Sequence, residues 1–266
     1  MDINSTVIIN KEKCIGCGQC CKDCPSHVLE LQGGKATTVS EQCLKCGHCI
    51  AICPKNAVTI SEYDMSEVQE IEKDGYSLDP KQLMQHLMFR RSIRRYKNIP
   101  VESEKINRII EAGRYTPTGS NEQGVRYIVL QNSIPMLEEA GIEKFKQLKK
   151  IASVLSKFIR LPYDLNKYKL EPGFLFQGAP LLILAISEDD VDAALASMSM
   201  ELMAEAQGLG TLYAGLFIRA ARHSKKIRNM LNLKKKEKVV AGLAIGYPDV
   251  IYQRTAPRKK ADVQLI

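Results

Sequence analysis

Nine cysteines are the residues with the clearest capacity for chemistry, and all of them lie between positions 14 and 53. Eight form two runs with the spacing C-x2-C-x2-C-x3-C-P, and the second run starts 29 residues after the first. In this spacing three thiolates bind one cubic iron–sulfur cluster, whereas the fourth binds the cluster of the other run. The sequence therefore predicts two 4Fe-4S clusters with crossed ligation. The expected ligands are Cys14, Cys17, Cys20 and Cys53 for the first cluster, and Cys43, Cys46, Cys49 and Cys24 for the second.

Two other uses of these cysteines are weaker. A disulfide framework needs an oxidising compartment, and no secretory signal precedes the cysteines. Structural zinc typically uses two C-x2-C pairs instead of two runs of four that end in proline. The ninth cysteine, Cys21, aligns with Ile50 of the second run, so we expect it to act as a small apolar side chain.

Residues 1–62 resemble a bacterial two-cluster ferredoxin, because both complete cysteine motifs are present. The resemblance implies a small pseudo-symmetric domain. Alternating apolar residues predict short strands at 7–9, 28–31 and 58–60. So small a unit has little core of its own, and we expect the clusters to supply much of its stability.

A second pattern places three polar side chains at alternate positions, Arg90-x-Ser92-x-Arg94, with Arg91 and Arg95 beside them. Arginines four residues apart can face the same way, and with a serine hydroxyl between them they can hold a phosphate by charge-assisted hydrogen bonds. Taken alone, such a run is more often a solvated basic face. No G-x-G-x-x-G fingerprint after a strand, P-loop or Ser/His/Asp arrangement accompanies it.

Three further motifs follow, and together with the first they resemble the FMN-dependent nitroreductase family over most of residues 80–266. Segment 117–123 matches the family's P-S-x-x-N-x-Q loop, 208–215 its G-L-G segment, and 246–248 its last strand. Arg258 matches its C-terminal phosphate-binding basic residue. Two departures concern the surroundings of a substrate: Gly124 stands where an aromatic residue or proline is usual, and 161–178 aligns with no family segment.

The resemblance implies roles for residues of this sequence. Arg90, Arg94 and Arg258 would neutralise the phosphate of FMN, and Ser92 would add a hydrogen bond. Segment 118–121 would reach the ribityl chain, while backbone groups at 214–215 would donate toward the reactive nitrogen of the ring. The expected FMN-binding residues are Arg90, Arg91, Ser92, Arg94, Pro117, Thr118, Gly119, Asn121, Gln123, Leu212, Tyr213, Ala214, Gly215 and Arg258. The resemblance also implies a mixed α+β fold and a homodimer, with FMN at the subunit interface and the C-terminal tail around the partner.

The elements expected to position these residues alternate along 80–266. Capping residues and apolar periodicity predict helices from Pro80, over 103–113, around 135–160, over 190–207 and over 224–231. Strands are predicted at 125–131, 180–187 and 238–246. The first helix has one apolar stripe, formed by Leu83, Met84, Leu87 and Met88. An aromatic-rich loop occupies 161–178, and the tail from 247 lacks a strong period.

Charge divides the chain in the same way. Residues 1–62 carry no net charge, 63–80 carry −5 and 81–266 carry +13, which gives the overall +8. We therefore expect an acidic linker at 63–79 between domains at 1–62 and 80–266. The basic second domain indicates an anionic ligand or an acidic partner, and nucleic acid is a weaker alternative because no reader motif is present. The longest apolar run is too short to span a bilayer, so we expect a cytoplasmic protein.

The two halves together predict an FMN-dependent oxidoreductase of an anaerobe. An external donor, either a soluble ferredoxin or NAD(P)H, would supply electrons, and a nitro compound, quinone or activated alkene would accept them. Two alternatives stay open. One is a non-catalytic electron-transfer subunit that serves a partner enzyme, and the other is flavin-dependent dehalogenation or dehydrogenation.

Overall fold

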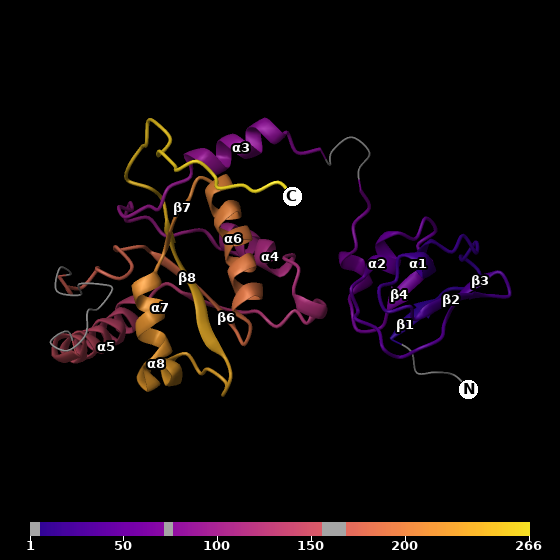
Figure 1. Cartoon of the computed structure of the whole chain (residues 1–266), viewed down its shortest axis with the longest axis horizontal. Coiled ribbons are helices and arrows are strands. Elements are labelled where there is room, and N and C mark those ends of the chain that lie inside the picture. Colours follow the sequence, from indigo (N-terminus) through magenta and orange to yellow (C-terminus); the bar gives the residue numbers. More distant parts are fainter. Residues whose placement is uncertain (1–5, 72–76, 156–168) are drawn as a thin grey trace. The chain divides into compact units, whose positions relative to one another are not determined.

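A computed structural model describes residues 6–71, 77–155 and 169–266, with the side chains of 151–155 left out. The chain divides into two compact units (Figure 1). The first contains Met1–Leu78 and Thr118–Glu122, and the second contains Asp79–Pro117 and Gln123–Ile266. Both units combine helices with antiparallel strands, so the fold is mixed α+β. Among the described helices, none has both the length and the apolar character of a membrane span.

The first unit is built from two short strand pairs and two one-turn helices. Strand β1 (Val7–Ile9) pairs with β4 (Val58–Ile60), and β2 (Leu29–Gln32) pairs with β3 (Lys35–Thr38), both antiparallel. Helices α1 (Gln19–Lys22) and α2 (His48–Ala51) begin 29 residues apart, like the cysteine runs that contain them. A single 3-10 turn, η1 (Met65–Glu67), follows β4. The predicted strands at 7–9 and 58–60 are observed, and β3 is an additional strand.

The second unit is organised around a four-stranded antiparallel sheet with the order β5-β6-β8-β7. Its strands are β5 (Arg126–Leu130), β6 (Leu181–Ser187), β7 (Gly210–Tyr213) and β8 (Lys238–Gly246). Every residue of β6 is buried. A continuous apolar run is typical of a strand that is covered on both faces, and the sheet is indeed enclosed by two layers of helices.

Alternate residues of β6 belong to different cores. Leu182 and Leu184 share a core with Phe217 and with other buried residues of three helices. These helices are α5 (Ile134–Leu155), α7 (Gly215–Arg222) and α8 (Lys225–Met230). Leu181 and Ile183 pack with α4 (Ser103–Arg114) and α6 (Asp190–Ala206). Figure 1 shows α4 and α6 on one side of the sheet, and α5, α7 and α8 on the other.

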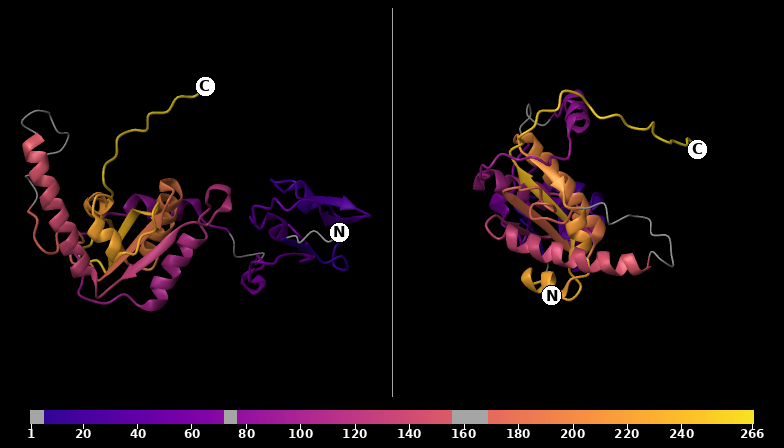
Figure 2. Two further views of the ribbon diagram at one scale, coloured as in Figure 1. Left: turned by 90° about the horizontal axis from the view of Figure 1, so that it is seen from below. Right: turned by 90° about the vertical axis from the view of Figure 1, so that its left-hand side faces the viewer.

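Helix α3 (Pro80–Phe89) begins as predicted, with the Asp79 side chain accepting a hydrogen bond from the N–H of Lys81. No residue of this helix is buried within the described chain. Its apolar stripe is therefore exposed, and Met84 and Met88 are more than half accessible. The C-terminal segment after β8 is extended, without helix or strand, and leaves the body of its unit (Figure 2).

Three elements differ from the sequence expectations. Helix α4 is capped by Glu102 without a side-chain hydrogen bond, and Ser103 is its first residue instead of its cap. Strand β7 and helix α7 were not predicted, although α7 buries Phe217, Ala220 and Ala221 along one face. Of the loop expected at 161–178, residues 161–168 lie outside the described residues. Residues 173–176 form a turn held by the Glu138 carboxylate, which accepts hydrogen bonds from the N–H groups of Gly173, Leu175 and Phe176.

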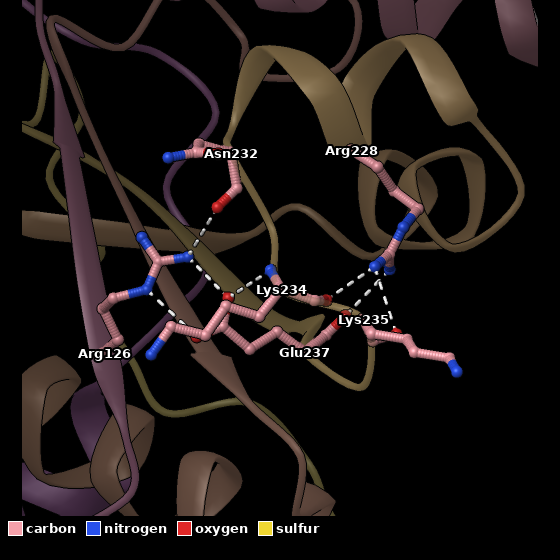
Figure 3. Close-up of polar contacts among 6 residues, drawn as sticks. All are labelled: Arg126, Arg228, Asn232, Lys234, Lys235 and Glu237. Carbon is pink, nitrogen blue, oxygen red and sulfur yellow. Dashed lines mark hydrogen bonds and ion pairs between the residues drawn. The ribbon is translucent and has the colours of Figure 1, made fainter.

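A network of two arginines holds the turn before β8 (Figure 3). Arg126 of β5 binds both carboxylate oxygens of Glu237, at 3.3 and 2.8 Å. Arg228 of α8 donates to the carbonyl oxygens of Lys234, Lys235 and Glu237. The Arg126 hydrogen bond is the main cause of a lowered pKa for Glu237. The turn therefore keeps its only carboxylate in an inward-facing ion pair, while its lysines remain exposed.

Candidate functional site

Two cavities in the first unit are each lined by four cysteines. Cys14, Cys17, Cys20 and Cys53 line the first cavity. Cys24, Cys43, Cys46 and Cys49 line the second. The last cysteine of each run thus faces the cavity of the other run. Neither run can provide four sulfurs to one cavity without the other.

The backbone around the cysteines repeats between the two runs. Gly18 and Gly47 have φ of 71° and 76° and precede α1 and α2 in the left-handed conformation, which glycine adopts without steric cost. His27 and Asn56 form a second such pair, with φ of 51° and 47°. The two halves therefore share local conformation as well as cysteine spacing.

Backbone N–H groups donate to three of the sulfurs. Ala36 donates to Cys14 at 3.4 Å, Lys45 to Cys43 at 3.3 Å, and Ala57 to Cys53 at 3.3 Å. Hydrogen bonds of this kind favour the thiolate, and those to Cys14 lower its pKa. Burial instead raises the pKa of Cys20 to about 12 and that of Cys49 to about 11. Because only thiolates bind iron, those two thiols must release protons when a cluster binds.

The cysteine geometry distinguishes a cluster from a single metal ion. All nine cysteines are free thiols. Within the described residues, no three His, Cys, Asp or Glu side chains are placed to hold one metal ion. A four-iron cluster makes a different demand, because each of its four thiolates binds a separate iron. Two cavities with four cysteines each fit that demand. Cys21 packs against the same core and is not among the residues that line either cavity.

In the second unit, three of the four flavin motifs meet at the start of β7. The N–H of Ile93 donates to the carbonyl oxygen of Thr211 at 2.8 Å, and Ser92 forms a parallel bridge with the same residue. Tyr96 forms an antiparallel bridge with Pro248. The structure therefore brings segments 90–96, 208–215 and 246–248 together, although Tyr96 and Pro248 lie 152 positions apart (248 − 96).

Arg90 ends helix α3 and points into the unit. Its Nη1 lies 2.7 Å from Oε1 of Glu201, whose side chain is 2% exposed. The hydroxyl of Thr211 donates to the same oxygen at 3.0 Å. Glu205 follows one turn later on α6, and its Oε1 is buried with no hydrogen-bond partner among the described residues. Burial and the charge of Glu201 raise the pKa of Glu205 to about 7.

The other site residues of this segment and of the tail differ in accessibility. Arg94 is exposed, and Ser92 is partly buried beside β7. The Arg91 guanidinium lies 5.7 Å from the centre of the Tyr252 ring. Arg258 lies in the extended tail, where it donates to the carbonyl oxygen of Pro257.

The motif at 117–123 is divided between the two units. Pro117 and Gln123 belong to the second unit, and Thr118–Glu122 groups with the first. The side-chain amide of Asn121 donates to the carbonyl oxygen of Lys45 at 3.0 Å, inside that group. Ser120, Asn121 and Gln123 have φ of 49°, 56° and 50°. Three left-handed residues other than glycine in so short a segment mark a strained backbone.

The segment 212–215 offers mainly backbone groups. The side chain of Leu212 belongs to the core, and the N–H of Ala214 already donates to the carbonyl oxygen of Gly242 at 2.8 Å. Of the two donors expected at 214–215, the N–H of Ala214 is thus occupied. Gly215 is the first residue of α7, so its N–H has no acceptor inside the helix. Burial and the Glu201 carboxylate raise the pKa of Tyr213 above its usual range.

Glu201, Glu205 and Thr211 were not found from the sequence. Two carboxylates four residues apart on a helix otherwise rich in Ala and Met were the available signal. A helix face of that composition packs into a core, and a buried carboxylate requires a cationic partner. The identity of that partner, Arg90, depends on a contact across 111 residues.

Comparison with known proteins agrees with the geometry. The model of the nitroreductase family matches residues 87–247, which is more than half of the chain. The chain belongs to the nitroreductase family. The model of the 4Fe-4S dicluster domain matches residues 6–54. A dicluster ferredoxin domain is therefore fused to a nitroreductase domain, and both resemblances found from the motifs are confirmed.

Three known proteins illustrate the similarity. Ferredoxin-2 of Desulfomicrobium norvegicum is 58% identical over 31 residues, 12% of this chain, and the match spans about half (52%) of that protein. A protein of Archaeoglobus fulgidus named as an NADH dehydrogenase/NAD(P)H nitroreductase is 25% identical over 159 residues, 60% of this chain and 81% of its own. A nitroreductase of Bacteroides fragilis with bound FMN has a TM-score of 0.55 at 18% identity, over 69% of this chain and 98% of its own. That last likeness establishes the fold alone.

Proposed function

We propose that the protein is an iron–sulfur flavoenzyme that reduces an electron-poor small molecule. The observation that carries the proposal is the presence of two four-cysteine cavities in the same chain as a nitroreductase-family unit. When bound, 4Fe-4S clusters transfer single electrons and FMN combines them into a two-electron reduction. Nitro compounds, quinones and activated alkenes are acceptors of this kind.

The chain's own residues supply binding and positioning in this proposal. The eight cavity cysteines hold the clusters, and N–H donors stabilise the thiolates of Cys14, Cys43 and Cys53. Arg94 and Ser92 lie on the segment that packs on β7, and with Arg90 they bind the phosphate of FMN. The N–H of Gly215 donates to the flavin ring. The remaining expected FMN contacts come from Arg91, Pro117, Thr118, Gly119, Asn121, Gln123, Leu212, Tyr213, Ala214 and Arg258.

The proposed assembly is a homodimer with FMN between the subunits. Helix α3 supports it, because five apolar side chains of this helix are exposed in one subunit. Exposed apolar residues arranged in this way commonly mark an interface. Arg258 in the extended tail then completes the phosphate site of the partner subunit. The electron donor is a soluble ferredoxin or NAD(P)H, and the name of the Archaeoglobus fulgidus relative supports a nicotinamide.

Anaerobic purification followed by iron and flavin analysis tests the proposal. We expect about eight irons and one FMN per chain. We also expect chemically reduced protein to pass electrons to a nitroaromatic, a quinone or an enone in excess. A preparation with iron and no flavin would contradict the proposal, and flavin that stays oxidised beside reduced clusters would contradict the order of electron flow. A flavin-loaded protein that reduces none of the acceptors would instead indicate an electron-transfer subunit.

Arg94→Ala and Arg95→Ala form a matched pair for the flavin site. Both arginines are exposed on the same segment, but Arg95 pairs with Asp249 at 3.4 Å and lies outside the R-x-S-x-R pattern. We expect Arg94→Ala to lower the FMN content with unchanged iron, because it removes a charge from the phosphate. Arg95→Ala should keep both cofactors. Equal loss of iron and FMN in the Arg94 variant would indicate misfolding instead.

A further inference from the structure

The ion pair between Arg90 and Glu201 is unusual for a residue expected to bind phosphate. The two side chains are 23% and 2% exposed, and Nη1 of Arg90 lies 2.7 Å from Oε1 of Glu201. A carboxylate buried to this degree is stable only when it is paired and hydrogen-bonded. Glu201 therefore needs Arg90 in the folded protein, whatever else Arg90 binds.

Thr211 connects this pair to the motif that contains Arg90. Its hydroxyl donates to Oε1 of Glu201 at 3.0 Å, and its carbonyl oxygen accepts the N–H of Ile93 at 2.8 Å. Thr211 is fully buried. One residue of β7 thus fixes the backbone of segment 92–93 and also the carboxylate that holds Arg90. Thr211 therefore holds the side chain of Arg90, through Glu201, and also the backbone beside Ser92.

The ion pair with Glu201 uses one nitrogen of the Arg90 guanidinium. A guanidinium has five N–H donors in a planar fork, and the contact with Glu201 occupies Nη1. Among the described residues, Glu201 is the one acceptor that bonds to this guanidinium, so its other N–H groups are available to a second acceptor, and 23% of the side chain is accessible. An arginine whose orientation is already fixed loses less conformational entropy when it binds, because its rotamers are restricted beforehand.

We propose that Glu201 is a positioning residue for the phosphate of FMN. It holds Nη1 of Arg90, and the free edge of the guanidinium then meets the phosphate together with Ser92 and Arg94. Thr211 fixes the position of this carboxylate relative to segment 90–96, because it bonds to both Glu201 and Ile93. The inference rests on the proposed function, since it requires that FMN binds at this segment.

The alternative is an ion pair that serves stability alone. The ratio of FMN affinity to riboflavin affinity separates the two roles, because riboflavin lacks the phosphate and otherwise has the same ring and ribityl chain. A change in stability alone lowers both affinities equally. A change in phosphate binding lowers the affinity for FMN and leaves that for riboflavin as it was.

The experiment measures binding of FMN and of riboflavin to flavin-depleted full-length protein that retains its clusters. We expect Glu201→Gln, which keeps the volume and loses the charge, to weaken FMN about tenfold, the low end of what losing the support of a ligand costs elsewhere. Riboflavin affinity should change less than twofold. Glu139→Gln removes an exposed carboxylate from α5 and should leave both affinities unchanged.

A second variant keeps the test valid if Glu201→Gln fails to fold. Thr211→Val keeps both Arg90 and Glu201 and removes the hydroxyl that donates to Oε1 of Glu201. It should leave riboflavin affinity unchanged and weaken FMN binding. If either folded variant keeps the wild-type ratio of FMN affinity to riboflavin affinity, the inference about Glu201 is overturned and the proposed function is not. A wild-type protein that binds neither flavin overturns the proposed function, and the inference with it.

Discussion

Cys24 and Cys53 are single residues whose position decides how the clusters are held. Each follows three cysteines of its own run but lines the cavity of the other run. The crossing arises because α1 and α2 turn the chain after the third cysteine, so that the fourth points away from it. Two half-sites joined in this way make each cluster dependent on both halves of the unit.

Replacement of Cys24 by Ala tests the crossed ligation. We expect Cys24→Ala to lose one cluster, so that iron falls from about eight to about four per chain. Combining it with Cys46→Ala should lose no more iron, because both residues line the same cavity. Combining it with Cys17→Ala should remove nearly all iron, because Cys17 lines the other cavity. Iron content and the paramagnetic signal of the reduced protein measure the result.

Cys21→Ala is the matched control for this series. Cys21 lies on α1 beside Cys20, is partly buried, and is not among the residues lining either cavity. Its replacement should leave the iron content unchanged. If Cys17→Ala removed no further iron from the Cys24→Ala variant, whereas Cys46→Ala removed nearly all of it, each run would bind its own cluster.

Glu205 gives the second unit a pH-dependent stability. Its pKa rises to about 7 because of burial and the nearby charge of Glu201, with Arg90 opposing the shift. A carboxyl whose pKa is higher in the folded than in the unfolded state stabilises the protein at low pH. That contribution is lost as the pH rises from about 4.5 to about 7. Above this window the folded chain carries an unfavourable buried charge.

Glu205→Gln should remove this cost. We expect the variant to be more stable than the wild type at pH 8 by about 1 kcal/mol, a value reduced from the full shift because Glu205 is partly accessible. The advantage should shrink as the pH falls toward 5. Thermal unfolding of the second unit at several pH values measures it, and Glu139→Gln is an exposed control. An advantage that does not depend on pH would refute the role of ionisation.

Among the elements, β7 joins the parts of the flavin site. Gly210 begins this strand, and a Cβ atom there would lie 2.3 Å from Cγ1 of Ile93 and 3.0 Å from Cγ of Pro248. Only glycine allows segments 90–96 and 246–248 to approach the strand so closely. The strand is four residues long, but it fixes the phosphate motif against the end of β8.

Gly210→Ala should therefore separate these segments. We expect a loss of about 1–3 kcal/mol in unfolding free energy, as for other cases of overpacking, together with a lower FMN content. Gly215→Ala is the control for stability, because nothing lies within 4 Å of the added Cβ atom. Denaturant unfolding monitored for each variant measures the difference. Equal stability of the two variants would mean that segment 90–96 shifts without cost.

At the scale of the whole molecule, the two units differ in how much core they have. The second unit has buried residues on both faces of its sheet. Among its described residues, the core of the first unit has eleven that are buried, and four of them are cysteines. A core of this size is marginal without further crosslinks, and clusters bound by cysteines from both halves provide such crosslinks.

Removal of the clusters should therefore unfold one unit and spare the other. We expect calorimetry of the intact protein to show separate transitions for the two units. After the iron is removed anaerobically with a chelator, the transition of the first unit should disappear and that of the second should remain. Persistence of both transitions would show that the first unit folds without iron.

The sequence by itself determined the chemistry and the elements that depend on local patterns. Cysteine spacing identified the cluster domain, and four short motifs in order identified the nitroreductase family. Long apolar or amphipathic segments also predicted β6, β8, α4 and α6 closely. These signals are local, since spacing along the chain fixes which residues can share a cluster, a strand face or a helix face.

Tertiary structure alone decided which distant groups meet. The pairing of Arg90 with Glu201 spans 111 residues, and the occupation of the Ala214 N–H by Gly242 depends on the pairing of β7 with β8. The short strand β7 is likewise set by its pairing with β8. The physical reason is that burial and long-range hydrogen bonds depend on the final arrangement of the sheet and its helices, which no local pattern encodes.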